Sequence, residues 1–267
     1  MKTLKKYFKK RTSVINFLLE QKQQSYSPDT FHKLRVEIKR LKALFDLLDY
    51  CTKKFKRNKI FKPFKLIFKQ GGKVRELQIE ESLIKEHSTT HLPVEYSTHL
   101  KKNQIKEQTH FFSILNKAFT KKLNNKYRKI LPFLSKINKK KLNNYRYKKR
   151  TKIEKLLSQN NLEIKKIHKL RKRLKAYLYN QQSLNSDKQI KLIRKNNILP
   201  ELLGEWHDYT VITEHLKKTI VSDVISSKEI NQLDNMIQIF TSKSELLFTK
   251  INTALPYPDF FKNPKTK

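Results

Sequence analysis

The sequence predicts an all-α protein in which the second half repeats the first. Only 3 Gly and 8 Pro occur in 267 residues, and most windows place apolar residues at helical spacing, whereas strand-like alternation is nowhere sustained. The stretches FHKLRVEIKRLKALFDLLDY and IHKLRKRLKAYL share one pattern of apolar and basic positions. We therefore expect a first helical half over 1–135, a charged connector or flexible basic arm over 136–152, a second helical half over 153–255 and an extended tail over 256–267.

The balance of charge indicates a polyanionic partner. Lys and Arg total 61 against 23 acidic residues, which gives a formal net charge of +38. Such an excess repels itself within a compact fold and attracts nucleic acid, an anionic membrane surface or a phosphate polymer. Composition alone does not distinguish among these partners, so the argument has to rest on where the cations lie in the sequence.

Two features bear on the compartment. Cys51 is the single cysteine, so an intramolecular disulfide is impossible. The opening MKTLKKYFKK lacks the apolar core of a signal peptide, and no stretch approaches the roughly 18 apolar residues that a membrane span needs. We expect a soluble, cytoplasmic protein.

A helix over about 30–51 has the clearest pattern in the first half. A helix over about 3–24 precedes it, and the polar QKQQSYSPD between them offers Ser27 or Asp29 as the N-cap. At about 100° per residue, one side of the 30–51 helix is apolar and an adjoining arc is basic. The apolar side holds Leu34, Ile38, Leu41, Phe45 and Leu48, and the basic arc holds His32, Arg35, Lys39 and Lys42.

A second cationic segment follows. No acidic residue occurs between Lys53 and Arg75, and Lys62, Lys65 and Lys69 share one helical face. A solvated face is the alternative for these lysines. Pro63 is expected in the first turn of this helix, and the pair at 71–72 is expected to interrupt or kink it.

The region after this segment reads as a loop or helix end and then a long polar helix over about 97–128. His87 and His91 have the i, i+4 spacing of a metal pair, but no Cys or third ligand motif accompanies them. We interpret them as surface histidines and expect no metal.

The second copy of the motif repeats the first about half the chain further on. Its apolar face holds Leu170, Leu174 and Tyr177, and its basic arc holds His168, Arg171 and Lys175. Either copy alone would be expected of any solvated amphipathic helix in so basic a protein. Because the spacing recurs, a functional basic face is the better interpretation. A last helix is expected over about 227–254.

A segment downstream of each copy also repeats. LPELLGEWHDYTVITEHL places Gly204, His207 and Asp208 at the positions that Gly72, Arg75 and Glu76 occupy in the first half. We expect Asp208 and Glu76 either to hold nearby His or Arg side chains in position or to serve at helix ends and in ion pairs.

These motifs resemble the CHAD domain, a histidine-containing α-helical domain, over nearly the whole chain. Its marks are His-x-x-Arg followed by a basic pair near a helix start in each half, and a Leu-Gly segment ending in Asp after each copy. In this chain Glu76 replaces the Asp of the first segment, and Ala176 removes a cation from the second copy. The first copy reads His32, Arg35, Lys39, Arg40 and Lys42, and the second reads His168, Arg171, Lys172 and Lys175. The glycine segments read GGKVRE at 71–76 and LGEWHD at 203–208. The ordered set of four motifs makes the resemblance specific.

The resemblance implies two helical bundles related by a pseudo-two-fold, with basic helix faces that meet around a central channel. It also implies non-catalytic binding of inorganic polyphosphate, often at polyphosphate granules, with no cofactor. We expect the polyphosphate-binding residues to be His32, Arg35, Lys39, Arg40, Lys42, Lys62, Lys65, Lys69, Arg75, His168, Arg171, Lys172, Lys175 and His207.

An RNA- or DNA-binding protein is the main alternative. Its net charge would follow the phosphate backbone, and Tyr145 and Tyr147 in the basic connector are candidates for stacking on bases, although no known nucleic-acid motif occurs. An enzyme that processes phosphate compounds is a minor alternative, because no Walker loop, nucleophile elbow or carboxylate-rich metal motif is present.

Overall fold

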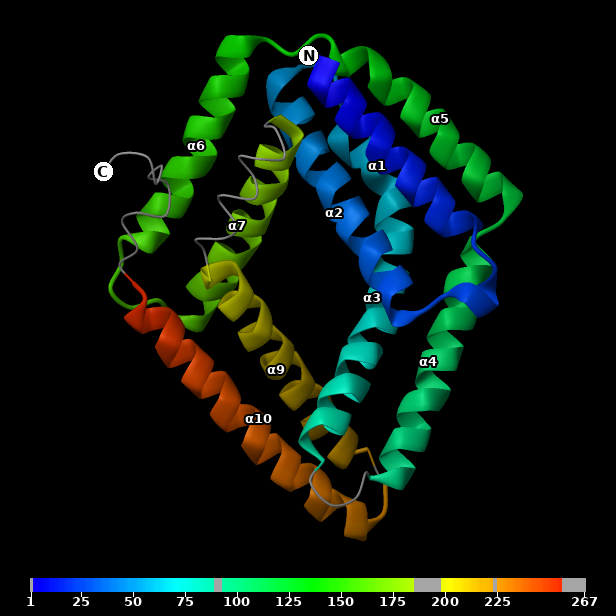
Figure 1. The fold of residues 1–267 in the computed structure, drawn as a ribbon, viewed down its shortest axis with the longest axis vertical. Coiled ribbons are helices and arrows are strands. Elements are labelled where there is room, and N and C mark those ends of the chain that lie inside the picture. The colour runs from blue at the N-terminus through cyan, green and yellow to red at the C-terminus, as the bar shows by residue number, and fades with distance from the viewer. Residues whose placement is uncertain (1, 89–92, 185–197, 223–224, 256–267) are drawn as a thin grey trace. The chain divides into compact units, whose positions relative to one another are not determined.

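Helices make up nearly all of the chain that the structure describes. The computed structural model describes residues 2–88, 93–184, 198–222 and 225–255, and no strand occurs in these ranges (Figure 1). The all-α class is therefore confirmed. The helices are α1 (Lys2–Glu20), α2 (Pro28–Cys51), α3 (Arg57–His87), α4 (Val94–Ile114), α5 (Lys117–Leu134), α6 (Lys139–Leu157), α7 (Ile164–Leu184), α9 (Leu199–Ile220) and α10 (Ser227–Thr253), with a short 3-10 helix at Gln23–Ser25.

The chain forms two units, one from Met1 to Tyr145 and one from Arg146 to Lys267. The division falls inside the basic run 136–152, most of which belongs to α6. An ordered helix therefore replaces the flexible arm that was one interpretation of this run. The tail over 256–267 lies outside the described residues. No described helix combines the length and the apolar character that a membrane crossing requires.

Helix α2 begins and ends close to the predicted bounds for identifiable reasons. The Ser27 hydroxyl oxygen accepts a hydrogen bond from the Thr30 amide at 3.2 Å, and Pro28 occupies the first helical position. The predicted apolar side is fully buried at Leu34, Ile38 and Leu41. Burial of each such side chain contributes about 1.5–3 kcal/mol relative to exposure.

In the first unit, α2 packs against both α1 and α3 (Figure 1). Arg11 of α1 forms an ion pair with Glu37 at 2.8 Å, whereas Arg35 contacts Phe68 of α3. Because Glu37 lies about 200° around the helix from Arg35, α1 and α3 cover opposite sides of α2. Helix α5 packs against α1 and α3, and α4 packs along α3.

Helix α3 is longer than the sequence predicts. Pro63 lies inside it rather than in its first turn, and the helix passes through Gly71 and Gly72 without interruption. Proline in a helix interior costs about 3 kcal/mol. Tertiary packing offsets this cost, since the neighbouring Phe64 and Ile67 are fully buried.

A break in the predicted 97–128 helix separates α4 from α5, so the expectation of one helix is wrong. Leu115 and Asn116 lie between the two helices, and the Asn116 side-chain oxygen accepts a hydrogen bond from the Phe119 amide at 2.8 Å. This contact caps α5 and lets the chain turn. The sequence pattern is continuous across this cap, so the pattern alone does not predict the break.

The second unit consists of α7, α9 and α10 together with the larger part of α6. Helix α9 packs between α7 and α10, and the apolar side predicted for the second motif is buried at Leu170 and Leu174. Trp206 of α9 and Phe240 of α10 complete this core. The last helix ends at Thr253, within one residue of its predicted end.

Candidate functional site

The motif cations of the first unit form what we call the α2/α3 cationic face: His32, Arg35, Lys39 and Lys42 of α2, and Arg75 of α3. Arg35 is held at three points. Its Nη1 donates to the Phe68 carbonyl oxygen at 3.0 Å, its guanidinium carbon lies 4.6 Å from the Phe68 ring centroid, and its Nη2 lies 4.0 Å from Glu76 Oε1. The guanidinium therefore has a defined position on α3 before any ligand is present.

Gly72 makes this position of Arg35 possible. A Cβ atom built on Gly72 would lie 2.0 Å from Arg35 Nη1, far inside van der Waals contact. The glycine is required for close approach of a side chain to the helix backbone, not for a break in the helix. The glycine segment of the motif thus seats the arginine of the other motif.

Two phenylalanines of α3 lie under the row of cations. The Lys39 ammonium is 5.9 Å from the Phe68 ring centroid, and the Lys42 ammonium is 6.0 Å from that of Phe61. Both distances are within the range of cation–π attraction. Phe61 and Phe68 are seven residues apart and share one face of α3, which is a sequence signal that the motif search missed.

His32 lies among cations rather than beside a stable counterion. Partial burial lowers the pKa of His32, and the positive charges of Arg75 and Lys39 lower it further, while Asp29 acts in the opposite direction. His32 is therefore mostly neutral near pH 7. An anion bound among these groups would reverse the electrostatic effect and favour the imidazolium.

Arg40 is not part of this face. It forms an ion pair with Glu37, whose side chain is only 7% exposed and also accepts from Arg11. Position 40 lies about 140° around α2 from Arg35, toward α1. The basic pair of the motif is thus divided, with Lys39 on the cationic face and Arg40 in a buried ion-pair cluster.

The three lysines predicted on α3 are exposed. Lys65 is four residues after Phe61 and three before Phe68, so it borders the α2/α3 cationic face. Lys62 and Lys69 lie further toward solvent. They can extend the positive field of the face without being part of its ordered contacts.

The second unit carries a corresponding α7/α9 cationic face: His168, Arg171, Lys172 and Lys175 of α7, and His207 of α9. The His168 ring centroid lies 4.6 Å from the Trp206 ring and 5.4 Å from the His207 ring, with the two imidazoles nearly perpendicular. Gly204 faces Lys175, whose Nζ would lie 3.9 Å from an added Cβ. The glycine again faces a motif cation, but here the contact is loose.

Burial shapes the charges of the α7/α9 cationic face. It lowers the pKa of Arg171 and of Lys175, and Asp208 partly offsets the effect on both. Burial and the charges of Lys172 and Arg171 lower the pKa of His168, while Glu214 acts in the opposite direction. Asp208 therefore has the electrostatic role expected of an acid that supports the motif arginine, as Glu76 does for Arg35.

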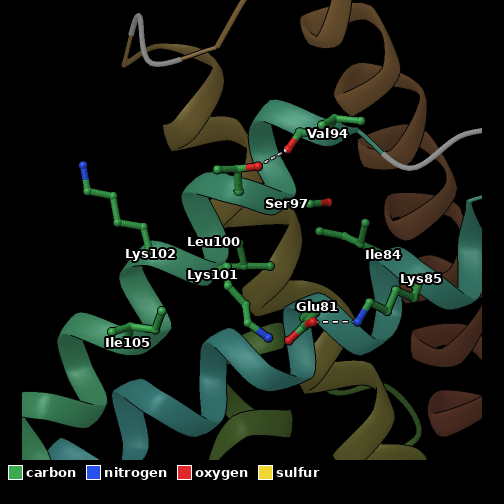
Figure 2. A pocket seen from close by; sticks show the side chains of 10 residues that line it. Glu81, Ile84, Lys85, Val94, Ser97, Leu100, Lys101, Lys102 and Ile105 are labelled. Atoms are coloured by element: carbon green, nitrogen blue, oxygen red, sulfur yellow. Dashed lines mark hydrogen bonds and ion pairs between the residues drawn. The ribbon is translucent and has the colours of Figure 1, made fainter.

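A cavity in the first unit lies away from the α2/α3 cationic face. A pocket of about 670 Å³ lies between the C-terminal part of α3 and the start of α4 (Figure 2). Ile84, Leu100 and Val94 give it apolar walls, and the Lys85 ammonium donates to Glu81 at its edge. None of the predicted site residues lines this pocket.

The alternative sites gain little from the structure. Among the described residues, no group of three or more His, Cys, Asp or Glu side chains could hold a metal ion, and His91 lies outside them. Tyr145 is 3% exposed and its ring packs 5.4 Å from that of Tyr50, so it is not available to a base. Tyr147 is 70% exposed.

Two pairs of helices in this all-α fold thus present His, Arg and Lys side chains. A glycine of the second helix, Gly72 or Gly204, faces a motif cation in each pair. The family model of the CHAD domain matches residues 16–217, a span from α1 to the last turn of α9 that includes all four motifs. The chain belongs to the CHAD domain family. No curated protein matches it.

Proposed function

We propose that this protein binds inorganic polyphosphate without catalysing its breakdown or synthesis. The observation that carries the proposal is the row of Arg35, Lys39 and Lys42 on the side of α2 that faces α3. The Arg35 guanidinium is held there by Phe68 and Glu76, in the space left by Gly72. Residues four and three apart on a helix are about 6 and 4.5 Å apart along its axis. Such a row offers charge-assisted donors at short intervals to a linear chain of phosphates.

The second unit supports the same proposal. Arg171 and Lys175 repeat the order of Arg35 and Lys39, and His207 adds a donor from α9. We propose that the two units are related as repeats by a pseudo-two-fold and that their cationic faces border one basic channel. Membership of the CHAD domain family is compatible with this arrangement.

The chemistry of the two faces favours binding over catalysis. Most of their side chains are cations, which hold phosphate oxygens, and Glu76 and Asp208 act on the motif arginines. An imidazole can also serve as a general base, but we assign His32 and His168 to phosphate binding because both lie among cations that would hold the bound phosphate. We propose a cytoplasmic role, with polyphosphate granules as a location.

Substitution of the motif arginines tests the proposal. We expect Arg35→Ala and Arg171→Ala each to weaken polyphosphate binding at least roughly tenfold, because a hydrogen bond to a charged group contributes about 1.5–3 kcal/mol. Calorimetry or anisotropy with labelled polyphosphate at fixed ionic strength measures this. Lys102→Ala on α4 is the matched control, since Lys102 is exposed and acts only through screened charge.

Equal losses in all three variants would mean a diffuse attraction and no defined site. A loss at Arg35 with no change at Arg171 would confine the site to the first unit.

Competition between polyanions adds a second criterion. Single-stranded RNA and duplex DNA should displace polyphosphate from these faces at least roughly tenfold more weakly than unlabelled polyphosphate, a difference of about 1.4 kcal/mol.

A further inference from the structure

A second cationic surface lies on the outer sides of α1 and α5. The chain has 23 acidic residues, but none between Lys2 and Leu19 and none between Gln108 and Ile153. The two helices lie side by side (Figure 1). Asn16 donates to Asn124 at 3.3 Å, and the Phe8 ring lies 6.1 Å from Tyr127, so the helices are antiparallel.

We call this surface the α1/α5 face and define it by the side chains that line two grooves. A groove on α1 is lined by Lys5, Lys6, Lys9, Lys10 and Ser13. A groove on α5 is lined by Leu115, Asn116, Lys117, Thr120, Lys121, Asn124, Asn125 and Arg128. Nearly all of these groups are donors of hydrogen bonds, and most carry positive charge.

The cations that line the two grooves form no salt bridge within the described residues, a property that they share with exposed lysines of other helices such as Lys102 and Lys106 of α4. Elsewhere Lys85 pairs with Glu81 at 2.6 Å and Arg150 with Glu154 at 2.6 Å. Beside the face, partial burial lowers the pKa of Lys126, and Lys129, Lys59 and Lys122 lower it further. The crowding of like charges favours a bound anion.

The α1/α5 face and the α2/α3 cationic face lie on different sides of the first unit. Helix α1 meets α2 through Glu37, about 200° around α2 from Arg35. A ligand on the outer side of α1 therefore does not compete sterically for Arg35. The two surfaces can be changed independently.

Phe17 decides what kind of anion fits. Its side chain is 64% exposed, and it lies one and two turns beyond Ser13 and Lys10 on the same side of α1. A chain of phosphates has no use for an aromatic ring, whereas an unpaired base stacks on one. Binding in the plane of a membrane would need a broad apolar face, but Phe17 has polar Ser13 one turn before it and Glu20 and Gln21 one turn after it at the end of α1. The exposed carboxylate of Glu20 keeps phosphates away from this end of the helix, so the phosphates are expected on the lysines that precede Phe17.

We propose that the α1/α5 face binds single-stranded nucleic acid, with the backbone phosphates on Lys and Arg side chains and a base stacked on Phe17. This site is separate from the proposed polyphosphate site. It requires no recognition of sequence, because every base has a face that can stack.

Binding of a labelled single-stranded oligouridylate to the full chain, measured by anisotropy near 0.15 M salt, tests the proposal. We expect Phe17→Ala to weaken binding roughly fivefold or more and Phe17→Tyr to restore it, because stacking on an aromatic ring is lost and regained. Lys6→Gln combined with Lys10→Gln should weaken binding and reduce the salt dependence. The matched control is Lys102→Gln with Lys106→Gln, two exposed lysines of α4.

Separation of the two sites provides the decisive comparison. We expect the α1 variants to keep polyphosphate affinity within about twofold and Arg35→Ala to keep oligouridylate affinity within about twofold. The proposal is overturned if Phe17→Ala binds oligouridylate like the wild type, or if the α1 lysine variants lose no more affinity than the α4 control. It is also overturned if the α1 variants lose binding to anionic lipid vesicles while oligouridylate binding is unchanged. Absence of polyphosphate binding to the wild type would refute the proposed function alone.

Discussion

The guanidinium of Arg35 occupies a space that exists because residue 72 has no side chain. The gap between an added Cβ and Nη1, 2.0 Å, is too small for both atoms. Since Nη1 is at the far end of a flexible side chain, the arginine would move and the helix would stay. The cost of a larger residue at this position therefore falls on the arginine.

We expect Gly72→Ala to weaken polyphosphate binding roughly tenfold while the protein keeps or gains stability. Alanine favours a helix by about 1 kcal/mol over glycine, whereas a displaced Arg35 loses its hydrogen bond to Phe68. Thermal unfolding and a binding titration on the same samples measure both effects. Gly204→Ala is the control, because the added Cβ would be 3.9 Å from Lys175. An unchanged affinity for Gly72→Ala would mean that Arg35 does not need its observed position.

The two motif histidines predict how binding depends on pH. In the free protein the pKa values of His32 and His168 lie below 6.5, chiefly through burial and next through neighbouring cations. A bound polyanion raises them, so protons are taken up on binding and affinity increases as pH falls. Because the pKa values of the two histidines are depressed in the free protein, the affinity should continue to increase below pH 6.5. It should level off once both histidines are protonated in the free protein as well.

Titration with polyphosphate at pH 7.5, 6.5 and 5.5 checks this expectation. The variant with His32→Gln and His168→Gln should show a flatter dependence. For the free protein the sign is opposite: a depressed folded-state pKa favours the neutral form, so the contribution of each histidine to stability is lost as pH falls below about 6.5. An affinity independent of pH would assign both histidines to packing.

At the scale of helices, the contact between α1 and α2 depends on one carboxylate. Glu37 accepts from Arg11 at 2.8 Å and also from Arg40, with little access to water. This arrangement explains why Arg40 has the sequence spacing of a motif cation but lies beside Glu37 instead of on the α2/α3 cationic face. The pairing of helices, rather than the spacing along one of them, determines which basic residues face a ligand.

We expect Glu37→Ala to lower the free energy of unfolding by on the order of 3 kcal/mol, because two largely buried arginines lose their counterion. Urea unfolding measures the change. The matched control, Glu154→Ala, removes a half-exposed i, i+4 partner of Arg150 and should cost about 0.5 kcal/mol. Equal, small losses in both variants would show that Arg11 and Arg40 reach solvent easily.

At the scale of the whole molecule, periodicity in the sequence predicts the helical class and the bounds of α2, because an apolar face with a Ser-Pro start leaves few alternatives. It does not predict that Pro63 and the two glycines lie inside α3. Proline and glycine in a sequence are normally interpreted as helix breaks. In α3, tertiary packing around Phe64, Phe111 and Arg35 keeps the helix continuous. The roles of Phe61 and Phe68 were also missed, since apolar residues beside a basic motif are normally assigned to the core.

The anchoring of Arg35 has a further consequence for the thermodynamics of binding. Immobilising a long side chain at an interface costs about 0.5–1.5 kcal/mol of conformational entropy. Folding has already restricted Arg35 through Phe68, Glu76 and the space at Gly72, whereas Lys62 and Lys69 are exposed and would lose more rotamer freedom on binding a ligand. If the proposed function holds, a polyphosphate chain would meet one preorganised donor surrounded by adaptable ones, and the phosphate bound to Arg35 would determine where its neighbours bind.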